Sequence, residues 1–309
     1  MYDLAILGGG PAGVAAGVYA SRKQLKTIFI TKDFGGQSVV SDSIENWIGS
    51  VTVSGADLAK NLEAHLRAYA GDVVTIETGQ LVQKVEKIEG GSGVGFRITT
   101  DKGTYDAKTV LVATGSHRRK LEVPGAEQFE HKGITYCASC DGPVFSGKDV
   151  VVIGGGNAGF ESAAQLLAYT KSVTMLHRSS EFRADPVTVE AVLKDPKMKA
   201  LKSVQILEVY GDKFVQGLKY NDEAGVEHDL PVQGIFVEIG AVPTTDYVKG
   251  LVDLTEYGQV KINPVNQRTS VDGIWSAGDC TDGLYHQNNI AAGDAVRALE
   301  DIYVFLKTK

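Results

Sequence analysis

Two cysteines, Cys137 and Cys140, stand three positions apart in the segment YCASCDGPVF, in a chain of 309 residues with one further cysteine, Cys280. A C-x-x-C pair can open and close as a dithiol/disulfide couple, in which a thiolate is the attacking group. Asp141 follows the pair directly, and its carboxyl group could protonate a leaving thiolate or take the proton back. The spacing therefore predicts thiol–disulfide redox chemistry here.

Three other uses of the cysteine pair stay open. Zinc needs four ligands, and the sequence has no second C-x-x-C pair and no nearby H-x-x-x-H, so we predict no metal site. A structural disulfide closing so short a loop would contribute about 2 kcal/mol in the loop-entropy description, and cytosolic reductants would tend to open it. Two thiols could also serve as small buried side chains, which is the role we expect for Cys280.

The elements that must position this chemistry come from an internal repeat. LAILGGGPAGVAAGVYA (4–20) and VVVIGGGNAGFESAAQLLA (150–168) each read as a short strand, a G-x-G-x-x-G turn and a helix rich in small residues. In such turns the first glycine makes the bend, the second lets a pyrophosphate approach, and the third allows close helix–strand packing. The glycines are Gly8, Gly10 and Gly13 in the first copy and Gly154, Gly156 and Gly159 in the second. Two copies predict two dinucleotide sites.

Both repeats continue in the same way, with a second strand and then an apolar strand that ends in glycine. These strands are expected at 26–31 and 109–115 in the first copy and at 172–177 and 234–240 in the second. The segment GIWSAGD (273–279) follows the second copy, yet it reads as the missing last strand of the first. The pattern predicts an α/β fold with two Rossmann-like dinucleotide-binding domains, the second inserted into the first.

The predicted boundaries follow from this insertion. The first domain would be discontinuous, formed by residues 1–116 and 246–309, and the inserted domain would span 117–245. Within the first domain, the glycine-rich stretch 88–95 predicts a hairpin turn. Ser54, with Asp57 three residues later, predicts a capped helix start.

Seven motifs occur in the order found in low-molecular-weight thioredoxin reductases, and the chain resembles this family from Tyr2 to about Leu306. The motifs are GGGPAG, GGQ (35–37), IENW (44–47), ATG (113–115), CxxCDG (137–142), GGGNAG and AGD (277–279). The resemblance implies that the discontinuous domain binds FAD, and that the inserted domain binds NADPH and carries the redox disulfide. It also implies a homodimer in which Cys140 faces the flavin and Cys137 attacks the partner protein.

The FAD contacts are carried over motif by motif. They would be Gly8, Gly10, Pro11, Ala12, Gly13, Gly35, Gly36, Gln37, Asn46, Gly115, Gly278, Asp279, His286 and Gln287. The family usually has YRQ where this chain has Tyr285-His286-Gln287. A neutral imidazole can still donate a hydrogen bond, but the fixed positive charge near the flavin is lost. The alternative is that His286 is an ordinary loop histidine.

The nicotinamide contacts are carried over in the same way. They would be Gly154, Gly156, Asn157, Ala158, Gly159, His177, Arg178 and Arg183. The segment LHRSSEFRAD resembles the HRRxxxR phosphate clamp with its second arginine replaced by Ser179. Arg178 stands where NAD sites usually carry a carboxylate, which favours NADPH, with NADH as the alternative. The loop could instead be an ordinary solvated one, nearly neutralised by Glu181 and Asp185.

We therefore expect an enzyme, a thioredoxin-disulfide reductase whose partner is thioredoxin or a thioredoxin-like disulfide protein. The motifs are also similar to the flavoprotein reductase of peroxiredoxin systems using NADH. Because the first strand begins at residue 3, we expect no additional N-terminal thioredoxin-like domain. A nicotinamide-independent dithiol oxidase is disfavoured by the intact GGGNAG, and a non-catalytic flavin-binding regulator by the CxxCD.

Composition excludes other classes of partner. The net charge is −7, and the longest basic run is RRK at 118–120, so we expect no nucleic-acid binding. The sequence has no stretch near the ~20 apolar residues of a membrane span. The N-terminus, MYDLAIL, is acidic where a signal peptide is basic, which predicts a cytoplasmic protein.

Overall fold

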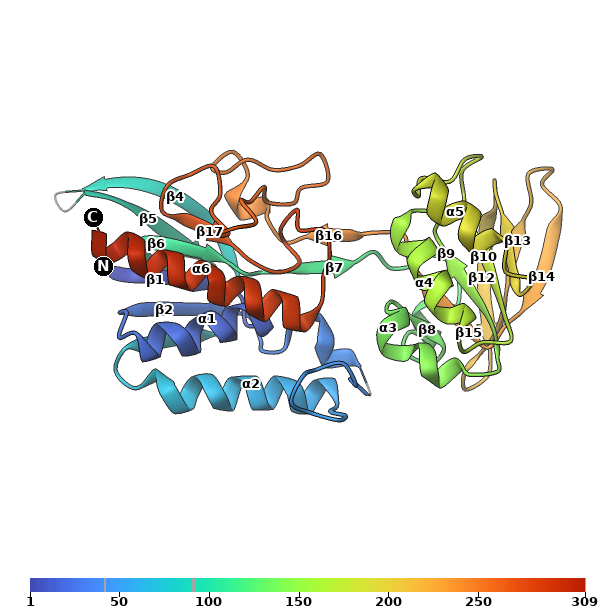
Figure 1. The fold of residues 1–309 in the computed structure, drawn as a ribbon, viewed down its shortest axis with the longest axis horizontal. Helices are drawn as coiled ribbons and strands as arrows, with labels where there is room; N and C mark the ends of the chain where they lie inside the picture. The colour runs from blue at the N-terminus through green and yellow to red at the C-terminus, as the bar shows by residue number, and fades with distance from the viewer. Residues whose placement is uncertain (42, 91–92, 309) are drawn as a thin grey trace. The chain divides into compact units, whose positions relative to one another are not determined.

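The chain folds into two compact units, each built on a parallel sheet (Figure 1). The computed structural model describes residues 1–41, 43–90 and 93–308. The first unit comprises Met1–His117 and Val242–Lys309, and the second comprises Arg118–Ala241. The predicted α/β fold with two Rossmann-like units is confirmed.

The parallel part of the first sheet has the strand order β3-β2-β1-β6, with β17 joined to β6. These strands are β1 (Tyr2–Leu7), β2 (Thr27–Thr31), β3 (Val74–Thr78), β6 (Thr104–Val112) and β17 (Ile274–Ser276). β17 runs parallel to β6, with Ile274 opposite Val110. The prediction that GIWSAGD completes the first unit is therefore confirmed.

An antiparallel extension continues this sheet beyond β6. β4 (Val82–Gly90) pairs with β5 (Gly93–Thr100), which in turn pairs with the first half of β6. The predicted glycine-rich turn falls between β4 and β5, and residues 91–92 of that prediction lie outside the described residues.

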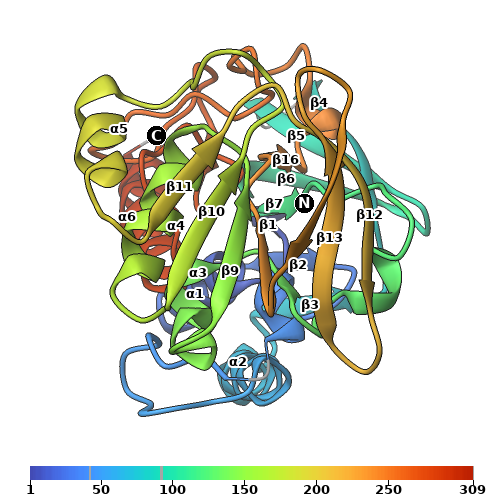
Figure 2. The ribbon, with the colours of Figure 1, turned by 90° about the vertical axis from the view of Figure 1, so that its right-hand side faces the viewer.

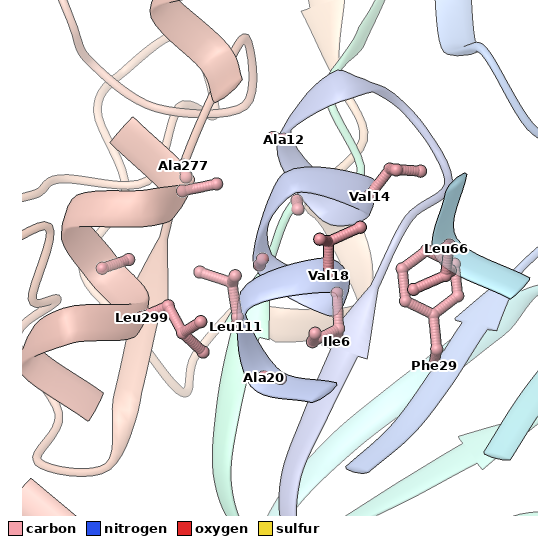
Figure 3. Close-up of a cluster of buried hydrophobic side chains, with 14 of the residues drawn as sticks. Ile6, Ala12, Val14, Val18, Ala20, Phe29, Leu66, Leu111, Ala277 and Leu299 are labelled. Carbon is pink, nitrogen blue, oxygen red and sulfur yellow. The ribbon is translucent and has the colours of Figure 1, made fainter. Parts of the chain in front are cut away.

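Three helices cover the parallel strands: α1 (Pro11–Arg22), α2 (Gly55–Ala70) and α6 (Asn288–Thr308). α1 is in contact with both of the others, and Figure 3 shows its small side chains, such as Ala12 and Ala20, within the buried cluster that also holds Phe29 and Leu66. Small residues let the helix lie close to its neighbours. At Gly17 of α1, an added Cβ would come within 2.7 Å of Leu66 Cδ1.

Polar side-chain contacts hold two of these helices. The Ser54 side chain accepts a hydrogen bond from the Asp57 backbone N–H at 3.0 Å, which confirms the predicted cap of α2. On α6, the Asp301 carboxylate accepts hydrogen bonds from Arg268 Nε at 2.5 Å and from the buried Trp275 indole N–H at 2.9 Å. These contacts join α6 to β17, the strand that precedes it.

The second unit repeats the same plan. Its parallel sheet has the order β11-β10-β9-β15-β8, and Figure 2 shows β11, β10 and β9 next to one another. The strands are β8 (Ile134–Thr135), β9 (Asp149–Ile153), β10 (Ser172–Leu176), β11 (Met198–Leu201) and β15 (Gly234–Val237), and the helices are α3 (Ala138–Asp141), α4 (Asn157–Leu167) and α5 (Pro186–Leu193). A separate antiparallel sheet has the order β12-β13-β14, formed by Gln205–Gly211, Val215–Asn221 and Glu227–Pro231.

Short elements complete the chain. β7 (Ser116–Arg118) and β16 (Ala241–Pro243), the two segments where the chain passes between the units, pair with each other. The 3-10 helices are Gly36–Val40, Glu127–Phe129, Gly142–Phe145 and Asp246–Val248. Across the described residues, the helices are all too short or too polar to cross a membrane.

Leu66 tests how much the α1–α2 contact contributes to stability. Its side chain is fully buried, so Leu66→Ala should lower the free energy of unfolding of the first unit by about 2–5 kcal/mol, through lost burial and a residual cavity. Urea unfolding followed by circular dichroism measures the change. Leu81→Ala is the matched control, because Leu81 is 52% exposed. Equal losses in the two variants would contradict this account of the core.

Candidate active site

Cys137 and Cys140 form a disulfide with their Cα atoms 5.3 Å apart, and both residues are half-buried. The short helix α3 begins directly after Cys137, which acts as its N-cap: the Cys140 backbone N–H lies 3.2 Å from Cys137 Sγ. One turn of helix thus places the two sulfur atoms within bonding distance. No group of three His, Cys, Asp or Glu side chains in the described part of the chain could hold a metal ion.

Asp141 is held beside the disulfide by two contacts. The Thr135 hydroxyl, on the buried end of β8, donates a hydrogen bond to the Asp141 carboxylate. The Asp141 backbone N–H donates to the Cys137 carbonyl at 3.0 Å. A carboxylate oriented in this way can exchange a proton with a thiol of the pair. Thr135 belongs to no motif, and its position two residues before the first cysteine is the only signal that the sequence offers for it.

The first glycine turn leaves an open space at its middle position. A Cβ added at Gly8 would lie 2.2 Å from the Ala113 carbonyl oxygen, and one at Gly13 would lie 1.8 Å from the Gly8 carbonyl oxygen. These two glycines are required by the packing of the protein itself. At Gly10, the nearest described atom to an added Cβ is Gly36 Cα at 4.0 Å. The open position at the start of α1 fits a pyrophosphate group.

The second turn has the same property. An added Cβ would lie 2.2 Å from the Glu238 carbonyl oxygen at Gly154, and 1.9 Å from the Gly154 carbonyl oxygen at Gly159. At Gly156 it would meet no heavy atom of the described residues within 4 Å. Asn157 and Ala158, which follow at the start of α4, are exposed. Both turns therefore suit a dinucleotide phosphate in the form that the motif predicts.

Predicted FAD residues that are far apart in the sequence meet in the first unit. Gln37 Nε2 donates to the Asp279 carboxylate at 3.3 Å and to the Ser116 hydroxyl at 3.2 Å. Asn46 Nδ2 donates to Gln287 Oε1 at 3.2 Å. The Gln37–Asp279 and Asn46–Gln287 contacts join the segment after β2 to the segment after β17, and the two residues of each contact are more than 240 positions apart in the sequence.

Glycines allow the same segments to lie close to the first glycine turn. The Gly35 backbone N–H donates to the Gly9 carbonyl at 2.9 Å. A Cβ at Gly278 would lie 3.4 Å from Ala12 Cβ, and Pro11 is the first residue of α1. Gly115 follows β6 with a φ of +65°, a left-handed conformation that glycine adopts without strain. The segments of Gly35 and Gly278 thus lie against the first turn and the start of α1.

His286 lies in the loop that leads into α6. Its Nε2 atom is buried and has no hydrogen-bond partner among the described residues. Asp294, on α6, interacts electrostatically with His286, and burial raises the pKa of the Asp294 carboxyl group. An ordinary loop histidine would expose its ring nitrogens to water. A buried ring nitrogen without a partner instead fits a group bound beside it.

His177 uses both ring nitrogens within the protein. The Gly155 backbone N–H donates to Nδ1 at 3.0 Å, and Nε2 lies 2.9 Å from the Glu181 carbonyl oxygen, which can only accept. The imidazole is therefore the neutral Nε2–H tautomer. The residue is 7% exposed, and its ring joins the loop that follows β10 to the second glycine turn.

Arg178 and Arg183 are exposed, and neither makes an ion pair within the described residues. The two carboxylates that could neutralise them are engaged elsewhere. Glu181 Oε2 lies 3.3 Å from Lys202 Nζ, while Asp185 Oδ1 accepts from backbone N–H groups in the first turn of α5. The loop thus presents two free guanidinium groups, which are suited to bind an anion.

Glu238, which follows β15, was not found from the sequence. Its side chain is 4% exposed, accepts a hydrogen bond from the Ser162 hydroxyl at 2.7 Å, and lies 3.6 Å from Arg118 Nη1. Burial raises the pKa of this carboxyl group, and Arg118 and Ser162 oppose the shift. A glutamate directly after an apolar strand gives no local signal, because its burial depends on partners from β7 and α4.

Comparison with protein families gives one match over nearly the whole chain. The sequence model of the family described as pyridine nucleotide-disulphide oxidoreductase matches residues 2–295.

Curated relatives cover this chain almost completely. An NADH dehydrogenase of Bacillus subtilis (strain 168) is 37% identical over 307 residues, which are 99% of this chain and 58% of the relative. An alkyl hydroperoxide reductase component of Pseudomonas putida is 38% identical over 300 residues, which are 96% of this chain and 56% of the relative. This chain therefore spans little more than half the length of these relatives.

Solved structures match the chain end to end. A thioredoxin reductase from Streptococcus pyogenes has a TM-score of 0.88 and 32% identity, and the match covers 100% of this chain and 99% of the other. A thioredoxin reductase from Giardia duodenalis has a TM-score of 0.89 and 30% identity, with 99% of each chain covered. These similarities are consistent with the two Rossmann-like units.

The second glycine turn allows ligand binding to be separated from folding. Gly156→Ala adds a methyl group to open space, with backbone angles of φ −95° and ψ −177° that alanine adopts. It should change the free energy of unfolding by less than about 0.5 kcal/mol, while weakening coenzyme binding at least ~10-fold by blocking the pyrophosphate. Gly159→Ala should instead destabilise the second unit by about 1–3 kcal/mol. Calorimetric titration and urea unfolding distinguish the two effects. Unchanged coenzyme affinity in Gly156→Ala would contradict the assignment of this turn.

Glu238 should make stability depend on pH. Because the folded-state pKa is raised, the unfolded chain ionises first, so the folded state loses stability as pH rises from the ordinary glutamate pKa through the raised one. Glu238→Gln removes this loss. The difference in urea midpoint between variant and wild type should be small near pH 4 and should grow, in favour of the variant, toward pH 7. Glu227→Gln, at an exposed glutamate, is the control and should show no such trend. A Glu238→Gln variant that is less stable than wild type at pH 7 would be inconsistent with desolvation as the main effect.

Proposed function

Because the chain belongs to the pyridine nucleotide-disulphide oxidoreductase family, we propose that it is a thioredoxin-type disulfide reductase. In this proposal, electrons pass from NADPH through FAD and the Cys137–Cys140 disulfide to thioredoxin or a thioredoxin-like disulfide protein. The observation that carries it is the Cys137–Cys140 disulfide, with Asp141 hydrogen-bonded beside it, in a unit that also holds an open glycine turn. A cytoplasmic homodimer is part of the proposal and is supported by the resemblance to thioredoxin reductases alone.

FAD is proposed for the first unit. The open space at Gly10, the Gln37–Asp279 contact and the buried Nε2 of His286 all lie on segments that the motifs assign to FAD. NADPH is proposed for the second unit, because Arg178 and Arg183 are exposed and make no ion pair with a carboxylate of the described residues. NADH stays the alternative coenzyme, and the name of the Bacillus subtilis relative, NADH dehydrogenase, favours it.

The chemistry of the disulfide follows from its position at the start of α3. A flavin held by the first unit would supply two electrons to the disulfide, having received them as a hydride from a nicotinamide. The Cys137–Cys140 bond breaks as these two electrons and two protons arrive, leaving a dithiol. The Cys137 thiolate then attacks a disulfide sulfur of the partner, and a mixed disulfide forms. Attack by Cys140 releases the partner as a dithiol and restores the original bond. Asp141 can take and return the thiol proton during these steps.

A second candidate function is reduction of a disulfide protein in a peroxiredoxin system. The Pseudomonas putida relative, named as a component of alkyl hydroperoxide reductase and 38% identical, favours this candidate. The two functions share the disulfide, the flavin and the open glycine turns. They differ in which protein accepts the electrons, so only the acceptor can separate them.

Coenzyme consumption tests the proposal directly. The flavin-loaded protein would be supplied with NADPH or NADH, and with thioredoxin, a peroxiredoxin-system disulfide protein, or no acceptor. Thioredoxin-dependent oxidation of NADPH is the expected result. Faster turnover with the peroxiredoxin-system protein would favour the second candidate. Oxygen uptake with a dithiol and no need for nicotinamide would establish an oxidase and exclude both. Size-exclusion chromatography of the same sample tests the homodimer.

The two cysteines have different predicted roles. Cys137→Ser should leave reduction of the flavin by NADPH intact, but should lower turnover of a disulfide protein at least ~100-fold, since no exchange nucleophile remains. Cys140→Ser should trap the partner as a stable mixed disulfide through Cys137. Non-reducing gel electrophoresis and stopped-flow absorbance of the flavin measure the two effects, and Ser139→Ala is the control between them. If either cysteine variant kept near-wild-type turnover, the redox role of the pair would be excluded.

A further inference from the structure

Lys202 lies next to the position where the phosphate clamp lacks a cation. It directly follows β11, whose last residue, Leu201, is opposite Leu176 at the end of the parallel strand β10. Figure 2 shows β10 and β11 side by side. Just beyond the strand ends, the Ser203 backbone N–H donates to the Ser179 carbonyl at 3.1 Å. The fold therefore brings the residue after β11 beside Ser179, although 23 positions separate Lys202 and Ser179 in the sequence.

The surroundings of the Lys202 side chain hold it only weakly. Its Nζ lies 3.3 Å from Glu181 Oε2 and 4.8 Å from the centre of the Phe182 ring. The Lys202 side chain is 38% exposed and that of Glu181 is 84% exposed. An ion pair this exposed to water contributes about 0–1 kcal/mol, and the contact with the ring about 0.5–1 kcal/mol. A phosphate group can therefore displace Glu181 from Lys202 at small cost.

Two further cations lie on the loop between β10 and α5, which also holds Ser179. Arg178 and Arg183 are exposed and make no ion pair within the described residues. The Arg183 backbone N–H donates to the Gly155 carbonyl at 2.8 Å, so this arginine is tied to the second glycine turn. Buried His177 joins the loop to the same turn. The positive charges are thus attached to the backbone that would hold a dinucleotide.

We propose that Lys202 is the third cation of a site for the 2′-phosphate of NADPH, in place of the arginine that is missing at Ser179. A phosphate monoester carries close to two negative charges at neutral pH, and lysine binds it as a mobile point charge. Glu181 holds Lys202 until the phosphate replaces it. This inference rests on the proposed use of NADPH, and it makes Lys202 a residue that determines coenzyme specificity.

Glu181 offers the opposite interpretation of the same loop. A carboxylate near the end of the second strand of a Rossmann unit can accept hydrogen bonds from the ribose 2′-hydroxyl of NADH. In that case Glu181 would contact the coenzyme, and Lys202 would only orient Glu181. The two interpretations predict opposite effects of removing the Glu181 charge.

The test uses the flavin-loaded protein and two fragments that differ by the 2′-phosphate, namely 2′,5′-ADP and 5′-AMP. Calorimetric titration gives their dissociation constants for the wild type and for Lys202→Met, Glu181→Gln and the control Lys199→Met. Lys199 is an exposed lysine on β11 itself. Steady-state kcat/KM for NADPH and NADH is measured in parallel.

Lys202→Met should weaken 2′,5′-ADP binding about 10-fold, as expected for the loss of one charge-assisted contact, and should change 5′-AMP binding less than ~2-fold. Glu181→Gln should strengthen 2′,5′-ADP binding about 2- to 3-fold. The preference for NADPH over NADH should follow the same order, and Lys199→Met should match the wild type.

Three results would overturn the inference. If Lys202→Met bound 2′,5′-ADP as tightly as Lys199→Met, while the wild type preferred 2′,5′-ADP to 5′-AMP, Lys202 would be excluded and NADPH use retained. If Glu181→Gln lowered kcat/KM for NADH without strengthening 2′,5′-ADP binding, Glu181 would be the ribose acceptor. If the wild type showed no preference for 2′,5′-ADP, both the proposed NADPH use and the role of Lys202 would fail.

Discussion

Close contact between strand and helix at each glycine turn is the constraint on which both units depend. An added Cβ would lie 1.8 Å from a carbonyl oxygen at Gly13 and 1.9 Å at Gly159, so only glycine permits this approach. With the contact made, the first turns of α1 and α4 stand next to the open space at Gly10 and Gly156. The backbone N–H groups at the start of each helix then have no helical partner and can bind phosphate oxygens. Packing and ligand binding thus depend on different glycines of the same motif.

The sequence predicts those features of the structure that neighbouring residues encode, and it does not predict contacts between residues far apart in the chain. The glycine turns, the cap at Ser54 and the strand in GIWSAGD are encoded within a few neighbouring residues, and the structure confirms these elements. The side-chain contact between Gln37 and Asp279 joins residues 242 positions apart, and motif resemblance assigned both to FAD without showing that they touch. Glu238 and Lys202 were missed because their surroundings arise from strand order and register, which no short segment encodes.

The Cys137–Cys140 disulfide needs fewer supporting residues than the two predicted dinucleotide sites. A single turn of helix after β8 brings the two sulfur atoms together, and the Thr135 hydroxyl orients the carboxylate that follows. This compact unit depends on local chain geometry, which explains why the C-x-x-C-D sequence predicted it well. Two hydrogen bonds from other elements hold its neighbours in place. Thr135 of β8 contacts Asp141, and Gln165 of α4 contacts Ser139. Neither Thr135 nor Gln165 belongs to a motif.

In the proposed NADPH site, the preference between NADPH and NADH would result from several small electrostatic contributions. Near the ends of β10 and β11 the cations are Arg178, Arg183 and Lys202, and the carboxylates are Glu181 and Asp185. Asp185 accepts hydrogen bonds from backbone N–H groups at the start of α5, so of these two carboxylates Glu181 is the one that pairs with a cation of the group, Lys202. Each charge-assisted contact with a phosphate would contribute on the order of 1.5 kcal/mol, and about 1.4 kcal/mol corresponds to a tenfold preference. In the proposed NADPH site, Ser179 alone would therefore not decide the preference between NADPH and NADH, because Lys202 could supply the charge of the missing arginine.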